Sequence, residues 1–471
     1  MKVSKVYLFF ISLLFFISCS KKDEVPGNVQ VQSFVWKGLN AYYLWQGEIS
    51  DLSDRRFTSD QQLYSYLSGF EDPNTLFESL LYQRNVVDKW SWIVDDYIAL
   101  EQAFQGTTLT TGMEFGLVRY KTQTANVFGY VRYVVQGTDA ETQGVTRGMI
   151  FNQVNGVQLT DQNYRSLLFS DANSYTIGLA DYNNGDPIAN STTITLTKSS
   201  YTENPVYIAK TLDVNGQKIG YLMYNSFTAN FDRQLNQAFA QFKADNITNL
   251  IIDLRYNGGG SVRTATRLGS MITGQFNGEV FAKQLWNNKY MSIANPESLI
   301  DRFPDVIDNN VSINSLNLTS VYFITTNNSA SASELVINSL LPYIDVKTVG
   351  TTTHGKYVGS ITLYDSPTFY SKKDINPNHN WAMQPIVLEI VNKNNQNQKN
   401  GIDPNVEIKE NYGDLGILGD INEPLLKRTI EYITTGSRGG VTVLPFTSEV
   451  IDNSKSGSPT YNNMYVTIKR D

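Results

Sequence analysis

The spacing of hydrophobic residues changes along the chain and divides it into three regions of different expected structure. From residue 31 to about 100, apolar residues recur at intervals of three and four, which predicts amphipathic helices. Residues 105–200 hold short runs of β-branched and aromatic residues, which are typical of strands. Residues 205–435 alternate between strand-like and helix-like segments, which indicates an α/β layer structure. The tail, 436–471, is rich in Ser, Asn and Gly, and no role is predicted for it.

The third region contains the most regular elements. Strands are expected at 219–224, 250–254, 321–325 and 346–350, and helices at 232–245, at 423–433, and from Ser331 to just before Pro342. The sequence therefore predicts a multidomain α/β protein in which a helical N-terminal domain and a β domain precede an α/β core. The helical domain is interpreted either as a packing module or as a regulatory domain.

The N-terminal segment reads as a targeting signal. Two lysines precede an apolar run over 6–17 that is short for a membrane-spanning helix. The run ends just before Cys19, as in a lipoprotein signal that is cleaved before a lipidated cysteine. We therefore expect 1–19 to be the signal peptide and lipidation site and 20–30 a tether. The protein would be exported and lipid-anchored in the bacterial cell envelope. The alternative is an uncleaved membrane anchor.

Composition narrows the chemistry that the chain can carry out. Of its 471 residues, 41% are apolar and 18% are charged, as in folded soluble proteins, and the net charge of −7 argues against a nucleic-acid partner. There is one cysteine, and there are two histidines, His354 and His379. These counts exclude a disulfide within the chain and argue against a cysteine nucleophile or a Cys/His zinc site. A serine hydrolase would therefore take its base from a histidine, a lysine or a carboxylate, and no cofactor is expected.

Two glycine-containing motifs mark the β region. Asn155-Gly156 lies between apolar runs, which predicts a tight hairpin turn. Together with an upstream Gly-Met-Glu-Phe-Gly-Leu segment, the region resembles a PDZ domain, in which backbone N–H groups hold a peptide C-terminus while the peptide adds a strand to the sheet. The alternative is an ordinary strand with a glycine turn. The resemblance implies that substrate C-termini bind at Gly112, Met113, Glu114, Phe115, Gly116 and Leu117.

A serine-rich segment separates an apolar strand from the helix that follows it. In Asn328-Ser329-Ala330-Ser331-Ala332-Ser333-Glu334, Ser331 stands at the expected helix N-terminus. The free N–H groups and the positive end of the helix dipole would stabilise an attacking alkoxide and the oxyanion that it creates. Ser331-x-x-Glu334 is also a capping box, so a purely structural interpretation of this serine stays open.

Two further motifs favour catalysis. Thr353-His354-Gly355-Lys356 places a lysine 25 residues after Ser331, a length that suits a helix and a returning strand. A buried lysine whose pKa falls from about 10.4 to near 7 or 8 can accept the proton of a serine. The second motif, Asp253-Leu254-Arg255-Tyr256-Asn257-Gly258-Gly259-Gly260, ends a buried strand in glycines whose N–H groups suit an oxyanion hole.

In this order, the motifs resemble those of the C-terminal processing peptidases, also called tail-specific proteases. The family pattern has a strand ending Asp-Leu-Arg-x-Asn-x-Gly-Gly, then Ser-Ala-Ser-Ala-Ser-Glu, then Gly-Lys. The chain matches it over about residues 30–435, and Asn327-Asn328 stand just before the second motif, which residues 329–334 match. The resemblance implies a ClpP/crotonase-like α/β peptidase core and cleavage of proteins or peptides through an acyl-enzyme. Its site residues would be Ser331 as nucleophile, Lys356 as general base, and the N–H groups of Ala332 and of Gly259 or Gly260 as oxyanion hole.

Alternatives to this assignment remain at three positions. Many members carry a glutamine four residues after the lysine, where this chain has Ser360, a possible third catalytic member with a shorter reach. His354 offers a Ser-His arrangement instead, and His379, in a loop-like segment, is expected to be exposed. Two other functions also stay open: a lipoprotein that binds peptides or other polymers without cutting them, and a non-peptide hydrolase such as an esterase.

Overall fold

A computed structural model describes residues 25–308, 311–439, 450–458 and 460–468. The predicted signal peptide and lipidation site, Cys19, lie outside these residues. The helical N-terminal domain starts earlier than predicted. Val29 is buried and the first long helix starts at Gln30, so these two residues of the expected tether belong to the domain. Within the described part of the chain, no helix is long and apolar enough to cross a membrane.

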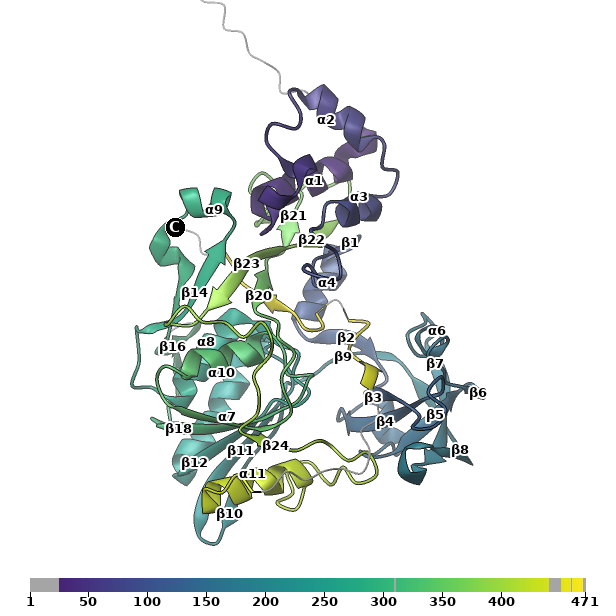
Figure 1. Ribbon diagram of the computed structural model, residues 1–471, viewed down its shortest axis with the longest axis vertical. Coiled ribbons are helices and arrows are strands. Elements are labelled where there is room, and N and C mark those ends of the chain that lie inside the picture. The colour runs from purple at the N-terminus through teal and green to yellow at the C-terminus, as the bar shows by residue number, and fades with distance from the viewer. Residues whose placement is uncertain (1–24, 309–310, 440–449, 459, 469–471) are drawn as a thin grey trace, which may run out of the picture.

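The N-terminal domain is a group of short helices packed on one end of the molecule (Figure 1). Its longest helix, α1, buries Phe34, Val35 and Leu39, the residues whose spacing predicted it. A short strand, β1, pairs with β22, so this domain is joined to a sheet made by residues nearly 300 positions later. The elements are α1 (Gln30–Tyr42), α2 (Asp60–Leu67), α3 (Pro73–Ser79), β1 (Trp92–Val94), α4 (Tyr97–Phe104), β21 (Leu363–Tyr364) and β22 (Ala382–Gln384).

The second domain is an antiparallel β-sheet. Its strands follow the order β3-β4-β5-β7-β8, with β6 paired to β5, and β2 and β9 form a separate ribbon that leads into the core. The predicted hairpin at Asn155-Gly156 is confirmed: both residues have positive φ, 51° and 78°, and they join β5 to β6. The elements are β2 (Thr107–Thr110), β3 (Met113–Arg119), β4 (Val127–Val134), α5 (Asp139–Thr142), β5 (Ile150–Val154), β6 (Val157–Gln158), α6 (Tyr164–Leu168), β7 (Ser174–Asp181), β8 (Ile188–Thr197) and β9 (Ser199–Thr202).

The core is built on a six-stranded sheet in the order β10-β11-β12-β18-β19-β24, parallel except for the β10–β11 hairpin. Because parallel strands are buried on both faces, the middle of β12, Leu250-Ile251-Ile252, is wholly apolar. Helices α7, α8 and α10 share one hydrophobic cluster with this sheet, and α11 shares another with its opposite face. The elements are β10 (Val206–Val214), β11 (Gln217–Tyr224), α7 (Asp232–Asp245), β12 (Asn249–Asp253), α8 (Val262–Ile272), β18 (Ser320–Thr325), α10 (Ala332–Leu340), β19 (Asp345–Gly350), β24 (Val406–Glu407) and α11 (Pro424–Thr435).

A second six-stranded sheet lies across the helices, in the order β13-β26-β20-β23-β14-β15. One of its strands, β26, comes from the C-terminal tail, and another tail strand, β25, joins the β domain beside β3. The described part of the tail is therefore built into two sheets. The elements are β13 (Gly260–Ser261), β14 (Val280–Trp286), α9 (Asn288–Ile293), β15 (Ile300–Arg302), β16 (Val306–Ile307), β17 (Val311–Ser312), β20 (Val358–Ser360), β23 (Ile386–Val391), β25 (Val450–Asn453) and β26 (Met464–Tyr465).

Candidate active site

Ser331 occupies a strained turn between β18 and α10. Its φ of 66° and ψ of −116° lie in a region that residues other than glycine rarely adopt, at a cost of about 1–3 kcal/mol. The turn is held because Ser329 Oγ donates to the Leu254 carbonyl and Ala330 N donates to the Asn257 carbonyl. These hydrogen bonds hold Ser331 in the strained conformation as the last residue before the helix, with its side chain buried.

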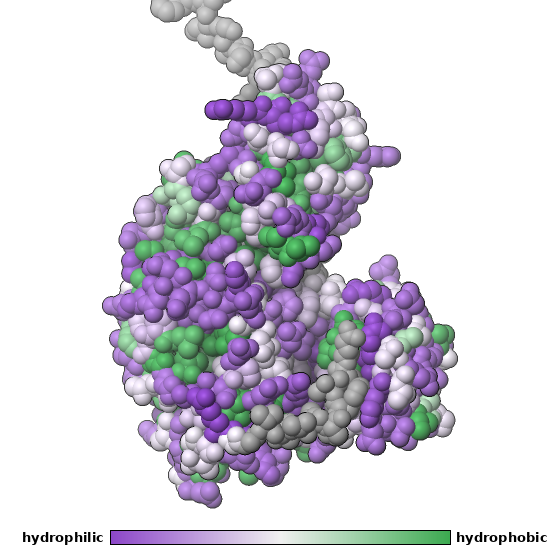
Figure 2. Space-filling model, viewed as in Figure 1, coloured by the Kyte–Doolittle hydropathy of each residue, from purple (hydrophilic) through white to green (hydrophobic). Residues whose placement is uncertain are grey.

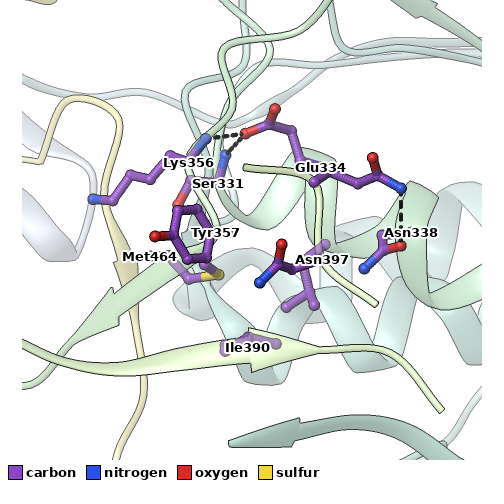
Figure 3. Close-up of a pocket in the computed structure, with 10 residues that line it drawn as sticks. Ser331, Glu334, Asn338, Lys356, Tyr357, Ile390, Asn397 and Met464 are labelled. Carbon is purple, nitrogen blue, oxygen red and sulfur yellow. Dashed lines mark hydrogen bonds between the residues drawn. The ribbon is translucent and has the colours of Figure 1, made fainter. Parts of the chain in front are cut away.

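Glu334 ties Ser331 to Lys356. One carboxylate oxygen, Oε2, accepts hydrogen bonds from the Ser331 N–H at 2.8 Å and the Lys356 N–H at 2.9 Å (Figure 3). The other oxygen accepts from the Gly355 N–H and from the Thr353 hydroxyl. Burial raises the pKa of Glu334, and these four hydrogen bonds act to lower it. A single buried carboxylate therefore brings together two residues that are 25 positions apart in sequence.

The Lys356 amine is buried, with only 2% of the residue exposed. Burial lowers its pKa from 10.5 to about 7, and the nearby carboxylates of Asp88 and Glu334 oppose this shift only in part. The Trp90 ring lies 5.6 Å from Nζ, so the N-terminal domain helps to bury the amine. A lysine with such a pKa is partly neutral at neutral pH and can act as a general base.

The glycine segment after β12 faces the same turn. A Cβ on Gly259 would lie 2.7 Å from Ser331 Cβ and 2.9 Å from the Ala332 nitrogen, and the φ of Gly259 is 107°, so only glycine fits there. The Gly259 N–H donates to Asn257 Oδ1 at 2.9 Å. Of the three predicted oxyanion-hole residues, Gly259 and Ala332 lie beside Ser331, and the one N–H of Gly259 is already donated to Asn257. Gly260 instead packs against Phe227 and pairs with Met464.

A buried ion-pair network lies behind this segment. The Arg255 side chain is completely buried and pairs with Asp253 at 2.7 Å, Glu423 at 2.6 Å and Glu410 at 3.4 Å. Although burial acts to raise the pKa of Glu410, Arg147 and Arg255 hold it below its usual value. The network joins the end of β12, from which the glycine segment starts, to the N-terminus of α11.

The remaining predicted positions have other partners. The Ser360 hydroxyl lies 2.7 Å from Gln384 Oε1 and 3.1 Å from Asn463 Oδ1. The pKa of His354 is lowered, first by burial and then by Lys356, and its ring bonds to the Asn327 backbone. The expectation that His379 is exposed is wrong: its side chain is 10% exposed and bonds to Asp365 at 3.0 Å, because the loop folds back on α1.

The Gly112–Leu117 segment is mostly strand rather than loop. Only Gly112 precedes β3, and its N–H donates to Thr110 Oγ1, while the Met113 N–H donates to Thr111 Oγ1. The Phe115 N–H donates to Ser454 Oγ of the C-terminal tail. The role of these residues in binding a C-terminus stays a prediction.

A cavity of about 870 Å³ extends from the β domain to the glycine segment beside Ser331. It is lined by residues of β3, by Gly258 and Gly259, and by Ser454 and Lys455 of the tail. Figure 2 shows the surface hollowed between the β domain, at the lower right, and the rest of the molecule. A smaller cavity beside Ser331 and Lys356 measures about 10 Å³, room for roughly one water. Among the described residues, no cluster of His, Cys, Asp and Glu could hold a metal ion.

Several residues around Ser331 and Lys356 were not predicted. Glu334 was considered only as a helix cap, and the motif itself could have suggested its second role, since it follows the serine by three positions. No sequence motif indicated that Asp88 and Trp90 lie near Lys356, because they belong to a different domain.

The cleavage rate should depend on pH through Lys356. We expect kcat/KM to rise about tenfold per pH unit up to about pH 7 and then to level off, because only the neutral amine accepts a proton. Initial rates on an unstructured protein, measured from about pH 5 to about pH 9 at constant ionic strength, check this. A rate that falls across this range would contradict a lysine base.

Two family models match the chain, and both describe the same peptidase family. The model of peptidase family S41 matches residues 218–408, and that of the S41 N-terminal domain matches residues 30–92. No curated protein matches the chain. A solved structure from Bacteroides fragilis NCTC 9343, assigned to the S41 proteases, is 22% identical with a TM-score of 0.65 and covers 86% of this chain and 97% of its own. The photosystem II D1 C-terminal processing protease is 17% identical with a TM-score of 0.49 and covers 85% of this chain and 96% of its own.

Proposed function

This chain belongs to peptidase family S41, and on that premise we propose that it is a serine endopeptidase of the C-terminal processing type with a Ser331–Lys356 dyad. One observation carries the proposal: Lys356 is buried, has a pKa of about 7, and is tied to Ser331 through Glu334. A surface lysine would stay charged and could not take a proton from serine.

The proposed reaction has two halves. Ser331 Oγ attacks the carbonyl carbon of the scissile bond while the neutral Lys356 amine takes the hydroxyl proton. The N–H groups of Ala332 and of Gly259 or Gly260 hold the negative oxygen of the tetrahedral intermediate. Lys356 then gives its proton to the leaving amine, which leaves the acyl group on Ser331. A water then attacks the ester carbonyl while Lys356 takes its proton, and Lys356 gives this proton to Ser331 Oγ as the ester bond breaks and the second product leaves.

We place substrate recognition in the β domain, which we infer to be PDZ-like. A peptide could add a strand beside β3 and pass along the 870 Å³ cavity to Gly258 and Gly259, next to Ser331. Export and lipid anchoring through Cys19 would hold the peptidase on a membrane surface, with its body in water.

Matched substrates test the proposal. An unstructured protein with a free apolar C-terminus should be cut, and the same protein ending in a carboxamide should show a KM about tenfold higher, since a charge-assisted hydrogen bond is lost. Equal cleavage of both would refute recognition of the C-terminus and leave the peptidase assignment standing. If the folded enzyme cuts neither substrate, the peptidase assignment is itself refuted.

A further inference from the structure

The C-terminal tail covers the free edge of β3. Strand β25 pairs with it in antiparallel register, with Asp452 opposite Leu117 and Asn453 opposite Gly116. The next residue, Ser454, continues the pairing: its N–H donates to the Phe115 carbonyl at 3.0 Å, and its hydroxyl donates to Glu114 Oε2 at 2.6 Å. The edge at which a peptide would add a strand is thus occupied by the chain's own residues.

The same tail then crosses the active site. Strand β26 lies between β13 and β20, with Met464 opposite Gly260 and Tyr465 opposite Ser360. The Asn462 carbonyl accepts a hydrogen bond from Lys356 Nζ at 2.6 Å. The Asn463 carbonyl oxygen lies 2.7 Å from the point where a Cβ on Gly259 would stand, the same distance as Ser331 Cβ. A peptide backbone therefore runs through the space that a substrate backbone needs.

Between these two strands, the tail places a basic side chain in an acidic part of the large cavity. Lys455 Nζ lies 3.6 Å from Glu203 Oε2 and 5.6 Å from the centre of the Tyr133 ring. Glu114 is the second carboxylate beside it. Burial raises the pKa of Glu114, the Lys455 amine acts to lower it, and the Glu203 carboxylate adds to the rise. If Lys455 were absent, Glu114 and Glu203 would lose their main positively charged neighbour. The position that Lys455 occupies in the cavity therefore favours a cation.

We propose that residues 450–458 and 460–466 are an intramolecular ligand of the enzyme's own substrate site, and that they display the substrate it prefers: an extended segment with a hydroxyl residue followed by a basic residue, bound at Glu114 and Glu203. The inference rests on the proposed peptidase function and adds a substrate class to it. The tail competes with substrates for both the β3 edge and the dyad.

The occupied state is not arranged for cutting. The Lys356 amine is engaged by the Asn462 carbonyl, whereas Ser331 Oγ has no hydrogen-bond partner in the described part of the chain. The tail also fits imperfectly, since the buried Asn462 Oδ1 and Asn463 Nδ2 have no partners there either. Unpaired buried amide groups weaken binding, so a substrate that pairs fully can displace the tail.

Charge reversal in the full chain tests the inference. In Lys455→Glu the tail is repelled by Glu114 and Glu203, so KM for an unstructured substrate containing Ser-Lys should fall about tenfold while kcat stays unchanged. Lys455→Arg, which keeps the charge, should behave like the parent, and so should Lys393→Glu, a charge reversal at an exposed lysine whose ion-pair partner is Glu279. The parent should also cut a Ser-Lys substrate at least about tenfold more efficiently than its Ser-Glu counterpart.

A binding measurement separates this inference from the peptidase assignment. A fluorescent peptide with the sequence of residues 450–466 should bind the Lys455→Glu chain about tenfold more tightly than the parent, whether or not either protein cuts. An unchanged KM and equal peptide binding, in a parent that cuts, would overturn the inference and leave the peptidase standing. If Lys455→Glu fails to fold, Ser454→Ala should also lower KM, because it removes the two hydrogen bonds of the hydroxyl, to the Glu114 carboxylate and from the Phe115 N–H, and keeps the backbone bond to the Phe115 carbonyl. An unchanged KM in this variant would overturn the inference.

Discussion

Replacing Ser331 with alanine is expected to lower kcat/KM for an unstructured protein by about 10³-fold or more, because no other atom can form the acyl-enzyme. Lys356→Met should lower it to a similar degree, since methionine fills the same buried space and cannot take a proton. The two losses should not add in the double variant, because the residues act in one step. Rates of cleavage, followed by the appearance of new N-termini, measure all three.

A matched control exists on the helix that follows Ser331. Ser339 lies on α10 and, like Ser331, is buried with a hydroxyl that has no partner within the described residues. Ser339→Ala should therefore cut like the parent. Circular dichroism must show that the Ser331 and Lys356 variants remain folded. Residual cleavage by folded Ser331→Ala at the parent's rate would show that another residue is the nucleophile.

Arg255→Met is expected to lower the free energy of unfolding by about 3–5 kcal/mol. Removal of the guanidinium leaves Asp253 and Glu423 buried and charged, with their main cation gone. Such a loss is a large part of the total stability of a typical domain. Urea unfolding followed by tryptophan fluorescence measures the change, and activity should fall as well, because the network supports the glycine segment beside Ser331.

The exposed pair Arg56–Asp51 gives the comparison. Its two atoms are 2.8 Å apart, as close as those of the buried pairs, yet both side chains are more than a third exposed. Arg56→Met should therefore change the stability by less than about 1 kcal/mol. Equal losses at the two arginines would show that burial of the Arg255 network does not determine its contribution.

Local patterns predicted much of this fold. The strands at β11, β12, β18 and β19 and the helices α7, α10 and α11 follow from runs of apolar residues and their spacing, and each is confirmed to within a few residues. The hairpin at Asn155-Gly156 follows from two residues that tolerate positive φ.

The electrostatics of the site could not be predicted in this way. The position of Lys356 near Ser331 follows from the length of one helix and one strand, whereas its lowered pKa depends on Trp90, which is 266 positions away in sequence. The tail posed the same difficulty. Its Ser- and Asn-rich composition is typical of a linker, and its strands form only because β3 and β13 offer unpaired backbone groups.

The contact between Trp90 and Lys356 also bears on the biosynthesis of this peptidase. A nascent chain emerges with its N-terminal helices first and its catalytic half last, and the Lys356 amine lacks the cover of Trp90 until the two halves dock. In water the amine keeps its proton, with a pKa of about 10.4, so Ser331 has no base. We therefore expect a copy whose two halves have not docked to have little proteolytic activity, since its lysine is a poor base at neutral pH.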